Sequence, residues 1–311
     1  MNSINFVLLG DSSIAAQLGK KGTATDIAIF DRKTSDVVYT WTVPVMFPEK
    51  IQSLMQAVNI AEYAILNVAA LDKYMGEQII ALDSAGISEG FVLHSYSVDR
   101  EKLRGTLKNT ALSGYQFVDS VDDLKTEMAK LKPRGREGPV MVAVDHAFDV
   151  KGVGTVALGV VRQGAVNVYD ELFLTPAMKP VLVKSIQMHD DPVQSSPSPA
   201  RVGLALKGVT AEDISRGDII CKADAVNIAT DQLTIKFEKS PFYKGDLLES
   251  QMYMMSVGMQ IRPVKVKNAG NGMLEISLEK PLAYQKGQAC VLLKPDNQGT
   301  RIIGKGQVQV Q

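Results

Sequence analysis

The chain has 311 residues, of which 45% are hydrophobic and 22% are charged, an ordinary balance for a soluble globular protein. At about 100–150 residues per domain, this length suits two or three domains. Basic and acidic side chains both number 34, so the formal net charge is zero. This balance argues against a broad basic surface, and we expect no DNA partner, although a local basic patch stays open.

The sequence shows no pattern for export or membrane insertion. The first residues, MNSINFVLLGDSS, lack a basic n-region and indicate a strand rather than a signal peptide. No apolar run reaches the roughly 18 residues of a membrane span. Cys221 and Cys290 lie far apart without metal-type spacing, which favours two free thiols in a reducing compartment. We therefore expect a cytoplasmic protein with no membrane partner.

Strand and helix patterns alternate over the first 131 residues. Apolar runs predict strands at 4–9, 26–32, 36–43, 63–70, 90–96 and 114–120, of which the second and third form an antiparallel hairpin. Helical spacing predicts helices from Pro48, over 74–85, over 99–112 and after Ser120, an N-cap with Asp123 three residues later. This alternation implies a mostly parallel sheet with helices on both faces.

The segment KPRGREGP, residues 132–139, breaks this pattern and is interpreted as a linker. After it, short valine-rich runs with turn residues about every 8–12 positions are typical of a small antiparallel barrel. A second series of such runs starts near residue 231, after a less patterned stretch at 222–228. The methionines of 251–259 are expected to fill the core of this last barrel.

The middle segment carries three blocks that resemble a known family. They are VAVDHAFDVKGVGTVALGVVRQGAV (142–166), KSIQMHDDPVQSSPSPARVGLALKGV (184–209) and DISRGDIIC (213–221). Together they resemble the second domain of translational GTPases of the elongation factor Tu class. The closing segment EKPLAYQKGQACVLLKPDNQGTRIIGKGQV resembles the third domain of archaeal-type selenocysteine-specific elongation factors, without their fourth domain.

The resemblance agrees with the element pattern on the fold class. We predict α/β plus all-β: a GTPase-like α/β domain over residues 1–132, then two small antiparallel β-barrels over 139–224 and 229–311.

The resemblance implies a GTP site, but its phosphate loop is altered. A loop of the form G-x-x-x-x-G-K-[ST] would start at Gly10, and Ala15, Ala16 and Gln17 stand where the glycine, lysine and hydroxyl residue are needed. The segment KKGTATDI resembles the end of switch I, with Ala24 in place of the metal-contacting threonine. Most of switch I is therefore missing.

Two further motifs of the family are also lost. In TVPVM, which resembles D-x-P-G-H, Thr42, Val45 and Met46 replace the aspartate, glycine and catalytic histidine. In YSVD, which resembles the guanine motif N-K-x-D, Asp99 remains but Ser97 replaces the lysine. We therefore expect no catalytic residue, no GTP and no other cofactor. The alternatives for Lys20, Lys21, Thr23 and Thr25 are a rebuilt phosphate site and a solvated turn.

The second domain offers a candidate RNA site, because in this family it holds the aminoacyl end and terminal adenosine of tRNA. The matching positions are His146, Phe148, Leu158, Gln187, His189, Asp190 and Arg201. Phe148 would stack on a base, and Arg201 would pair with a phosphate or carboxylate. Two positions depart from the family: Leu158 replaces a hydroxyl residue, and Asp190 replaces a cation. We predict RNA contacts by His146, Phe148, Gln187, His189 and Arg201, with barrel packing or an exposed loop as the alternative.

Other candidate sites have weaker support. His146 and His189 would need Asp145, Asp190 and Asp191 nearby to bind a metal, and their spacing does not indicate this, so no metal is expected. His94 lies on an apolar strand and is interpreted as a core residue. The basic run KLKPRGR at 130–136 is either a charged linker or an RNA contact.

These patterns predict a non-catalytic, translation-elongation-factor-like protein that binds tRNA or the ribosome without hydrolysing GTP. One alternative is a protein-interaction module that holds a translation-related protein on the same scaffold. The other is an atypical GTPase. Without switch loops ordered by a γ-phosphate, we expect a single domain arrangement.

Overall fold

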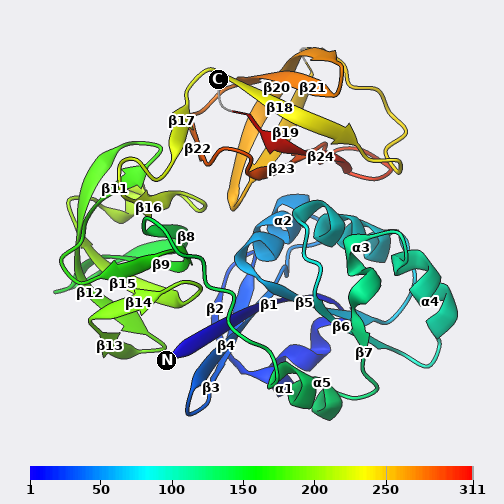
Figure 1. Cartoon of the computed structure of the whole chain (residues 1–311), viewed down its shortest axis with the longest axis horizontal. Helices are drawn as coiled ribbons and strands as arrows, with labels where there is room; N and C mark the ends of the chain where they lie inside the picture. The colour runs from blue at the N-terminus through cyan, green and yellow to red at the C-terminus, as the bar shows by residue number, and fades with distance from the viewer. Residues whose placement is uncertain (250, 310–311) are drawn as a thin grey trace.

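The computed structural model describes residues 1–249 and 251–309. An α/β domain and two closed, six-stranded antiparallel barrels surround a central space (Figure 1). This arrangement confirms the fold class predicted from the sequence. None of the helices in the described part of the chain is both long enough and apolar enough to cross a bilayer.

The first domain is a seven-stranded sheet with helices on both faces. Its strands are β1 (Asn2–Gly10), β2 (Lys20–Ala24), β3 (Ala28–Lys33), β4 (Val37–Val43), β5 (Tyr63–Val68), β6 (Gly90–His94) and β7 (Gln116–Phe117). Its helices are α1 (Ala15–Leu18), α2 (Ile51–Ile60), α3 (Lys73–Ala85), α4 (Arg100–Leu107) and α5 (Val121–Met128), with 3₁₀ turns η1 (Ser12–Ile14) and η2 (Ala111–Gly114).

The strand order is β2-β3-β4-β1-β5-β6-β7, and the pairings from β4 to β7 are parallel. On β1, Val7 and Leu9 join the core beneath α2, α3 and α4, whereas Phe6 and Leu8 join the core beneath α1 and α5. Because both faces are covered, this strand is mostly apolar, with Ser3 and Asn5 as its buried polar residues.

Several boundaries in this domain differ from the sequence prediction. The hairpin of β3 and β4 is confirmed, as is Ser120, whose Oγ accepts the Asp123 amide at 3.0 Å. The helix expected from Pro48 begins at Ile51, because a turn occupies the preceding residues. The helix expected over 99–112 divides into α4 and η2, and the strand expected over 114–120 shortens to β7. At the division, the Thr110 side chain caps η2 rather than continuing α4.

The second domain forms its barrel from β8 (Met141–Val150), β9 (Gly154–Gln163), β11 (Glu171–Thr175), β12 (Lys179–Met188), β15 (Arg201–Lys207) and β16 (Ile219–Cys221). The ring closes because β11 pairs with both β16 and β12. Smaller elements decorate it: β10 (Ala165–Asn167), β13 (Asp191–Val193), β14 (Ser195–Pro197) and the 3₁₀ turn η3 (Ala211–Asp213).

The third domain closes in the order β18-β21-β20-β19-β23-β24. These strands are β18 (Gln232–Lys239), β19 (Met252–Val257), β20 (Gln260–Gly270), β21 (Met273–Leu278), β23 (Ala289–Leu293) and β24 (Ile302–Val308). A further pair, β17 (Asn227–Ala229) and β22 (Leu282–Tyr284), attaches the start of the domain to it, two residues before the expected position 229. Residues 310–311 of the expected 229–311 domain lie outside the described residues.

The methionines of 251–259 do not all fill the third barrel. Met255 is buried in its core, but Met252 is 43% exposed. Met254 packs against the core of the first domain, and Met259 packs with Ile60 and residues of the second barrel. The prediction of a common barrel core was therefore wrong, because this strand also faces the two other domains.

A turn at Arg216, Gly217 and Asp218 on the second domain contacts both neighbouring domains. The Arg216 guanidinium forms an ion pair with Asp26 of the first domain. The Asp218 carboxylate pairs with Arg262 of the third domain, with an N–O distance of 3.3 Å. Between them Gly217 adopts a left-handed conformation with φ of 92°. One short turn thus fixes the positions of both partners.

The first and third domains share a buried interface. Arg301 donates to the Glu77 carboxylate on α3, with N–O distances of 2.5–3.1 Å, and both residues are less than 10% exposed. The Arg301 guanidinium also donates to the Pro48 carbonyl oxygen at 2.6 Å. Apolar side chains of the third domain continue the core beneath α2 and α3, namely Val291, Leu293 and Ile302.

We predict that Gly217→Ala lowers the free energy of unfolding more than Gly152→Ala does. Both glycines have φ near +90°, which disfavours alanine by about 1–2 kcal/mol. At Gly152 a Cβ would meet nothing within 4 Å, but at Gly217 it would lie 2.6 Å from the backbone of Met259 and Gln260. This overpacking adds about 1–3 kcal/mol to the loss of unfolding free energy. Urea denaturation of the two variants measures the difference, and equal losses would contradict the close approach.

We predict that both cysteines resist a thiol reagent in the native protein. Cys221 and Cys290 are free and buried. Burial raises the pKa of Cys221 to about 11 and that of Cys290 to about 12. Since the thiolate is the reactive form, neither should be labelled at about pH 8, whereas both should be labelled in guanidinium chloride. A dithionitrobenzoate assay measures this, and rapid labelling of native protein would show that one barrel core is open.

Candidate functional site

The loop after β1 is the one that the sequence resemblance aligns with a phosphate loop. The Gly10 amide donates to Oε1 of Gln78 at 2.5 Å, and the Asp11 amide donates to the Asn67 carbonyl oxygen at 2.8 Å. The Asp11 carboxylate accepts the Ser13 amide and hydroxyl, both at 2.9 Å. The chain's own carboxylate therefore caps the short helix, where its charge would repel a phosphate.

The segment after this loop forms a short helix and then an edge strand. Ala16 and Gln17 are exposed on α1, a helix of four residues. The following segment is an edge strand, β2, in which Lys20 pairs with Asp31 and Lys21 with Phe30 of β3. The solvated turn expected here was therefore wrong for residues 20–24, because their backbone pairs with the sheet while the lysines stay exposed.

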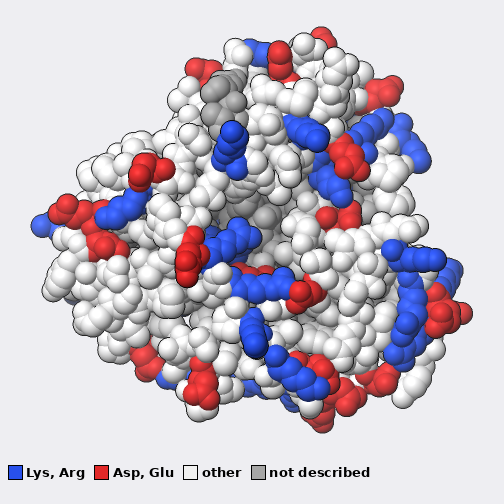
Figure 2. Space-filling model, in the orientation of Figure 1, with Lys and Arg blue, Asp and Glu red and all other residues white. Residues whose placement is uncertain are grey.

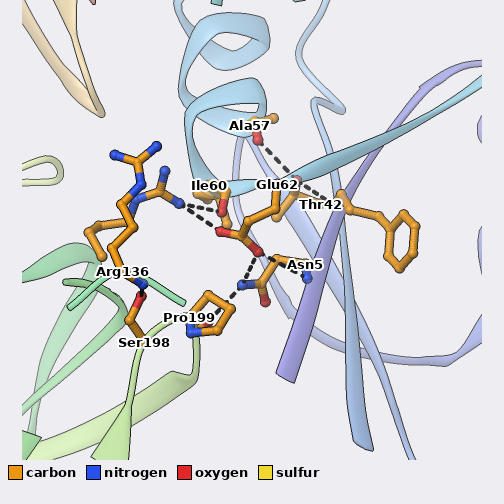
Figure 3. Close-up of polar contacts among 10 residues, drawn as sticks. Asn5, Thr42, Ala57, Ile60, Glu62, Arg136, Ser198 and Pro199 are labelled. Atoms are coloured by element: carbon orange, nitrogen blue, oxygen red, sulfur yellow. Dashed lines mark hydrogen bonds and ion pairs between the residues drawn. The ribbon is translucent and has the colours of Figure 1, made fainter. Parts of the chain in front are cut away.

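The other two motif positions have structural roles. Thr42 is buried, and its Oγ lies 3.1 Å from the carbonyl oxygens of both Phe6 and Ala57 (Figure 3). An aspartate at position 42 would place its negative charge against these two acceptors. Asp99 caps α4 by accepting the Lys102 amide at 2.9 Å. This capping role accounts for an aspartate at position 99 without a guanine ligand.

Sequence reasoning missed the residues that fill the phosphate loop. A signal for Asp11 was present, since an aspartate directly after a strand with a serine two residues later is typical of a helix N-cap. Gln78 and Asn67 gave no such signal, because they reach the loop only through the fold.

The predicted RNA-binding positions share the outer face of the second barrel. Strand registers place His146, Leu158, Gly203 and Gln187 in one row across β8, β9, β15 and β12. Phe148 lies two residues beyond His146 on the same face, with ring centroids 5.9 Å apart, and is 39% exposed. The structure thus places His146, Phe148 and Gln187 on one face, with the His146 and Phe148 rings adjacent, Gln187 three strands away, and Phe148 available for stacking.

Arg201 and His189 have partners within the chain. Arg201 forms a two-pronged ion pair with the buried Asp145, with N–O distances of 2.9 and 3.2 Å. His189 Nε2 lies 3.1 Å from the Asp31 carboxylate of the first domain. His189 and Asp190 form a two-residue hairpin turn and both have positive φ. Asp145 went unrecognised as the Arg201 partner because 56 residues separate them.

The space between this face and the first domain is almost closed. A cavity of about 10 Å³ remains there, lined by residues that include Thr23, Thr25, His146 and Arg216. That volume holds at most about one water molecule. Any RNA contact on this face would therefore use the exposed side of the row, where Phe148 lies.

Two further interpretations can be compared with the structure. Within residues 1–249 and 251–309, no group of three or more His, Cys, Asp or Glu side chains could hold a metal ion, so the five residues considered above do not form one cluster. His94 was expected in the core, but it is half-buried at the end of β6, with Nδ1 3.1 Å from the Ser95 carbonyl oxygen. The strand ends there, so the ring reaches the surface.

Known proteins resemble the chain along its whole length. Residues 154–221 match the family model for elongation factor Tu domain 2. The uncharacterized protein MJ0325 of Methanocaldococcus jannaschii is 32% identical over 298 residues, covering 95% of this chain and 96% of its own length. The crystal structure of translation elongation factor SelB from Methanococcus maripaludis, in complex with the GTP analogue GppNHp, superposes with a TM-score of 0.81 at 22% identity. That match covers 99% of this chain and 79% of SelB.

The chain belongs to the translational GTPase family of elongation factors. The selenocysteine-specific elongation factor of Methanocaldococcus jannaschii is 27% identical over 274 residues, which cover 78% of this chain but only 57% of that factor. The family membership confirms the resemblance drawn from the sequence. The altered loop motifs therefore stand on a scaffold shared with elongation factors.

Proposed function

We propose that the protein is a non-catalytic member of this family that binds tRNA or the ribosome in the cytoplasm without binding or hydrolysing GTP. One observation carries the proposal: at the phosphate loop, the amides of Gly10, Asp11 and Ser13 are already hydrogen-bonded within the chain. A phosphate would have to break these bonds and approach the Asp11 carboxylate, with no lysine to offset that charge.

The domain contacts support a function without a nucleotide switch. Arg216 of the second domain contacts Asp26 and Thr25, which belong to the segment that resembles the end of switch I. Arg301 of the third domain contacts Glu77 and the Pro48 carbonyl oxygen. These contacts are made within the chain, without a nucleotide. The outer face of the second barrel would thus be presented in one fixed arrangement, whether or not a nucleotide is present.

We predict that GTP, GDP and ATP with Mg²⁺ leave the melting temperature unchanged. A ligand of the native state at about 100 times its Kd stabilises by about 2.7 kcal/mol, which a thermal melt detects readily. SelB from Methanococcus maripaludis, crystallised with a GTP analogue, is the positive control. A shift with guanine nucleotides alone would reinstate the atypical GTPase, and Lys20 and Lys21 would be the first residues to replace.

A second function, a protein-interaction module, is favoured by a specific observation. Arg201 and His189 are both engaged by carboxylates within the chain, which lowers their value as phosphate ligands. A scaffold that only holds a translation-related protein would not need them free. The two functions differ in whether the exposed ring of Phe148 contributes to RNA binding.

We predict that Phe148→Ala weakens tRNA binding by about 5- to 150-fold, the effect of losing about 1–3 kcal/mol of base stacking. Phe242→Ala is the matched control, because Phe242 is 57% exposed on the third domain, outside the proposed face. Fluorescence anisotropy at low salt, with charged and uncharged tRNA, measures both variants. If the wild-type protein binds neither tRNA nor ribosomes, the interaction module replaces the RNA-binding proposal.

A further inference from the structure

The three domains and the linker enclose a central cavity of about 650 Å³. Figure 2 shows it as a hollow at the centre of the molecule, with Lys and Arg side chains at its rim. This volume lies within the range of about 300–1,000 Å³ that is usual for small-ligand pockets. Because the predicted RNA-binding row contributes no residue to the lining, this cavity is a separate feature.

The cavity lining is strongly positive. Arg134 and Arg136 come from the linker, Arg162 from the second domain and Lys286 from the third, whereas Glu62 is the acidic residue among the described residues that line it. Four cations thus face one carboxylate. The lining also contains amide side chains that can donate hydrogen bonds, including Gln163, Gln285 and Gln288.

The Glu62 carboxylate already has hydrogen-bond partners within the chain. Glu62 accepts from Arg162 at 3.0 Å and from the Asn5 side chain at 2.9 Å (Figure 3). Burial raises the pKa of Glu62, and the nearby Arg162 cation partly offsets this. A second carboxylate, Glu89, pairs with Arg134 from outside the lining. These carboxylates balance Arg162 and Arg134 but leave the charge of Arg136 uncompensated.

Arg136 and Lys286 are the lining cations for which no side-chain partner is found among residues 1–249 and 251–309. Arg136 is exposed and forms no ion pair there; its backbone amide donates to Ser198 Oγ at 3.3 Å, and its carbonyl oxygen accepts from the Gly164 amide at 2.7 Å. No dashed line runs from the Arg136 guanidinium in Figure 3, although its positive charge helps to lower the pKa of Glu62. Burial lowers the pKa of neighbouring Arg162, and the positive charge of Arg136 lowers it further. An anion between these two cations would relieve their repulsion.

We propose that the central cavity binds a compact, multiply charged anion of the phosphate type, such as pyrophosphate or tripolyphosphate. Guanidinium groups match phosphate oxygens through paired hydrogen bonds, and the hollow gathers several such groups in one place. The described lining residues include no aromatic side chain on which a nucleobase would stack. The chemistry therefore favours the anion alone over a nucleotide.

Such an anion would join the linker to the second and third domains. Arg136, Arg162 and Lys286 approach the cavity from three different parts of the chain. A bound polyanion would contact all three, so it would stabilise their present arrangement and would be released when they separate. This would be a small-molecule control of domain packing that does not involve the phosphate loop.

Thermal melting and isothermal titration calorimetry test the proposal on the full chain. The probes are inorganic phosphate, pyrophosphate, tripolyphosphate and citrate, each against sodium chloride at equal ionic strength, since salt itself screens charges. We expect tripolyphosphate and pyrophosphate to raise the melting temperature and citrate to have little effect. Arg136→Gln should weaken tripolyphosphate binding by about tenfold or more, the loss of one charge-assisted interaction.

Two controls make the result decisive. Arg104→Gln removes an exposed arginine of α4 that does not line the cavity, and its binding should equal that of the wild type. Lys286→Gln provides a second test if Arg136→Gln folds poorly. The proposal is overturned if tripolyphosphate fails to bind the wild type, if Arg136→Gln and Lys286→Gln bind it equally well, or if citrate binds as tightly. GTP melting tests a different loop, so either proposal can fail alone.

Discussion

The arrangement of the three domains depends on one turn, Arg216–Gly217–Asp218. Its arginine reaches the first domain, its aspartate reaches the third, and its glycine allows the third-domain backbone to approach within contact distance. Removing two charges from water costs free energy that offsets most of the attraction in a partly buried ion pair. These pairs therefore orient the domains more than they raise the free energy of unfolding. Their value is that both domains are held by groups on a single rigid element. The relation between the first and third domains is then fixed twice, by this turn and by Arg301 with Glu77.

Polar groups also find partners within the chain at the positions that the resemblance aligns with nucleotide motifs. Backbone amides need hydrogen-bond partners, which a ligand, water or the chain can supply. At the loop after β1, Gln78 and Asp11 supply acceptors. At position 42, a buried threonine hydroxyl fits between two carbonyl oxygens. These contacts leave the surrounding strands and helices in place, so the α/β fold is recognisable.

The sequence predicted what local patterns encode and missed what distant residues decide. Apolar alternation and turn spacing sufficed for the three-domain fold, and the family resemblance placed His146, Phe148 and Gln187 on one face. The edge strand β2 was missed because KKGTA has neither alternation nor a buried side, and only its backbone pairing defines it. The partners of Arg201 and His189 lie 56 or more residues away, so no spacing rule could have identified them.

The positions of charged residues in the fold are a further feature that local sequence patterns do not predict. A net charge of zero argued against a broad basic surface, but it says nothing about where in the fold the charges gather. The basic run at 130–136 was interpreted as a charged linker or an RNA contact, and its arginines instead line the central cavity beside Arg162. Burial strengthens the repulsion between like charges because less water screens them; Arg134 and Arg162 are half-buried here, whereas Arg136 and Lys286 are exposed. The convergence of these cations from the linker and two domains favours a compensating charge, and Glu62 is already engaged by Arg162 and Asn5. That imbalance, rather than any sequence motif, points to an anion at the centre of the molecule.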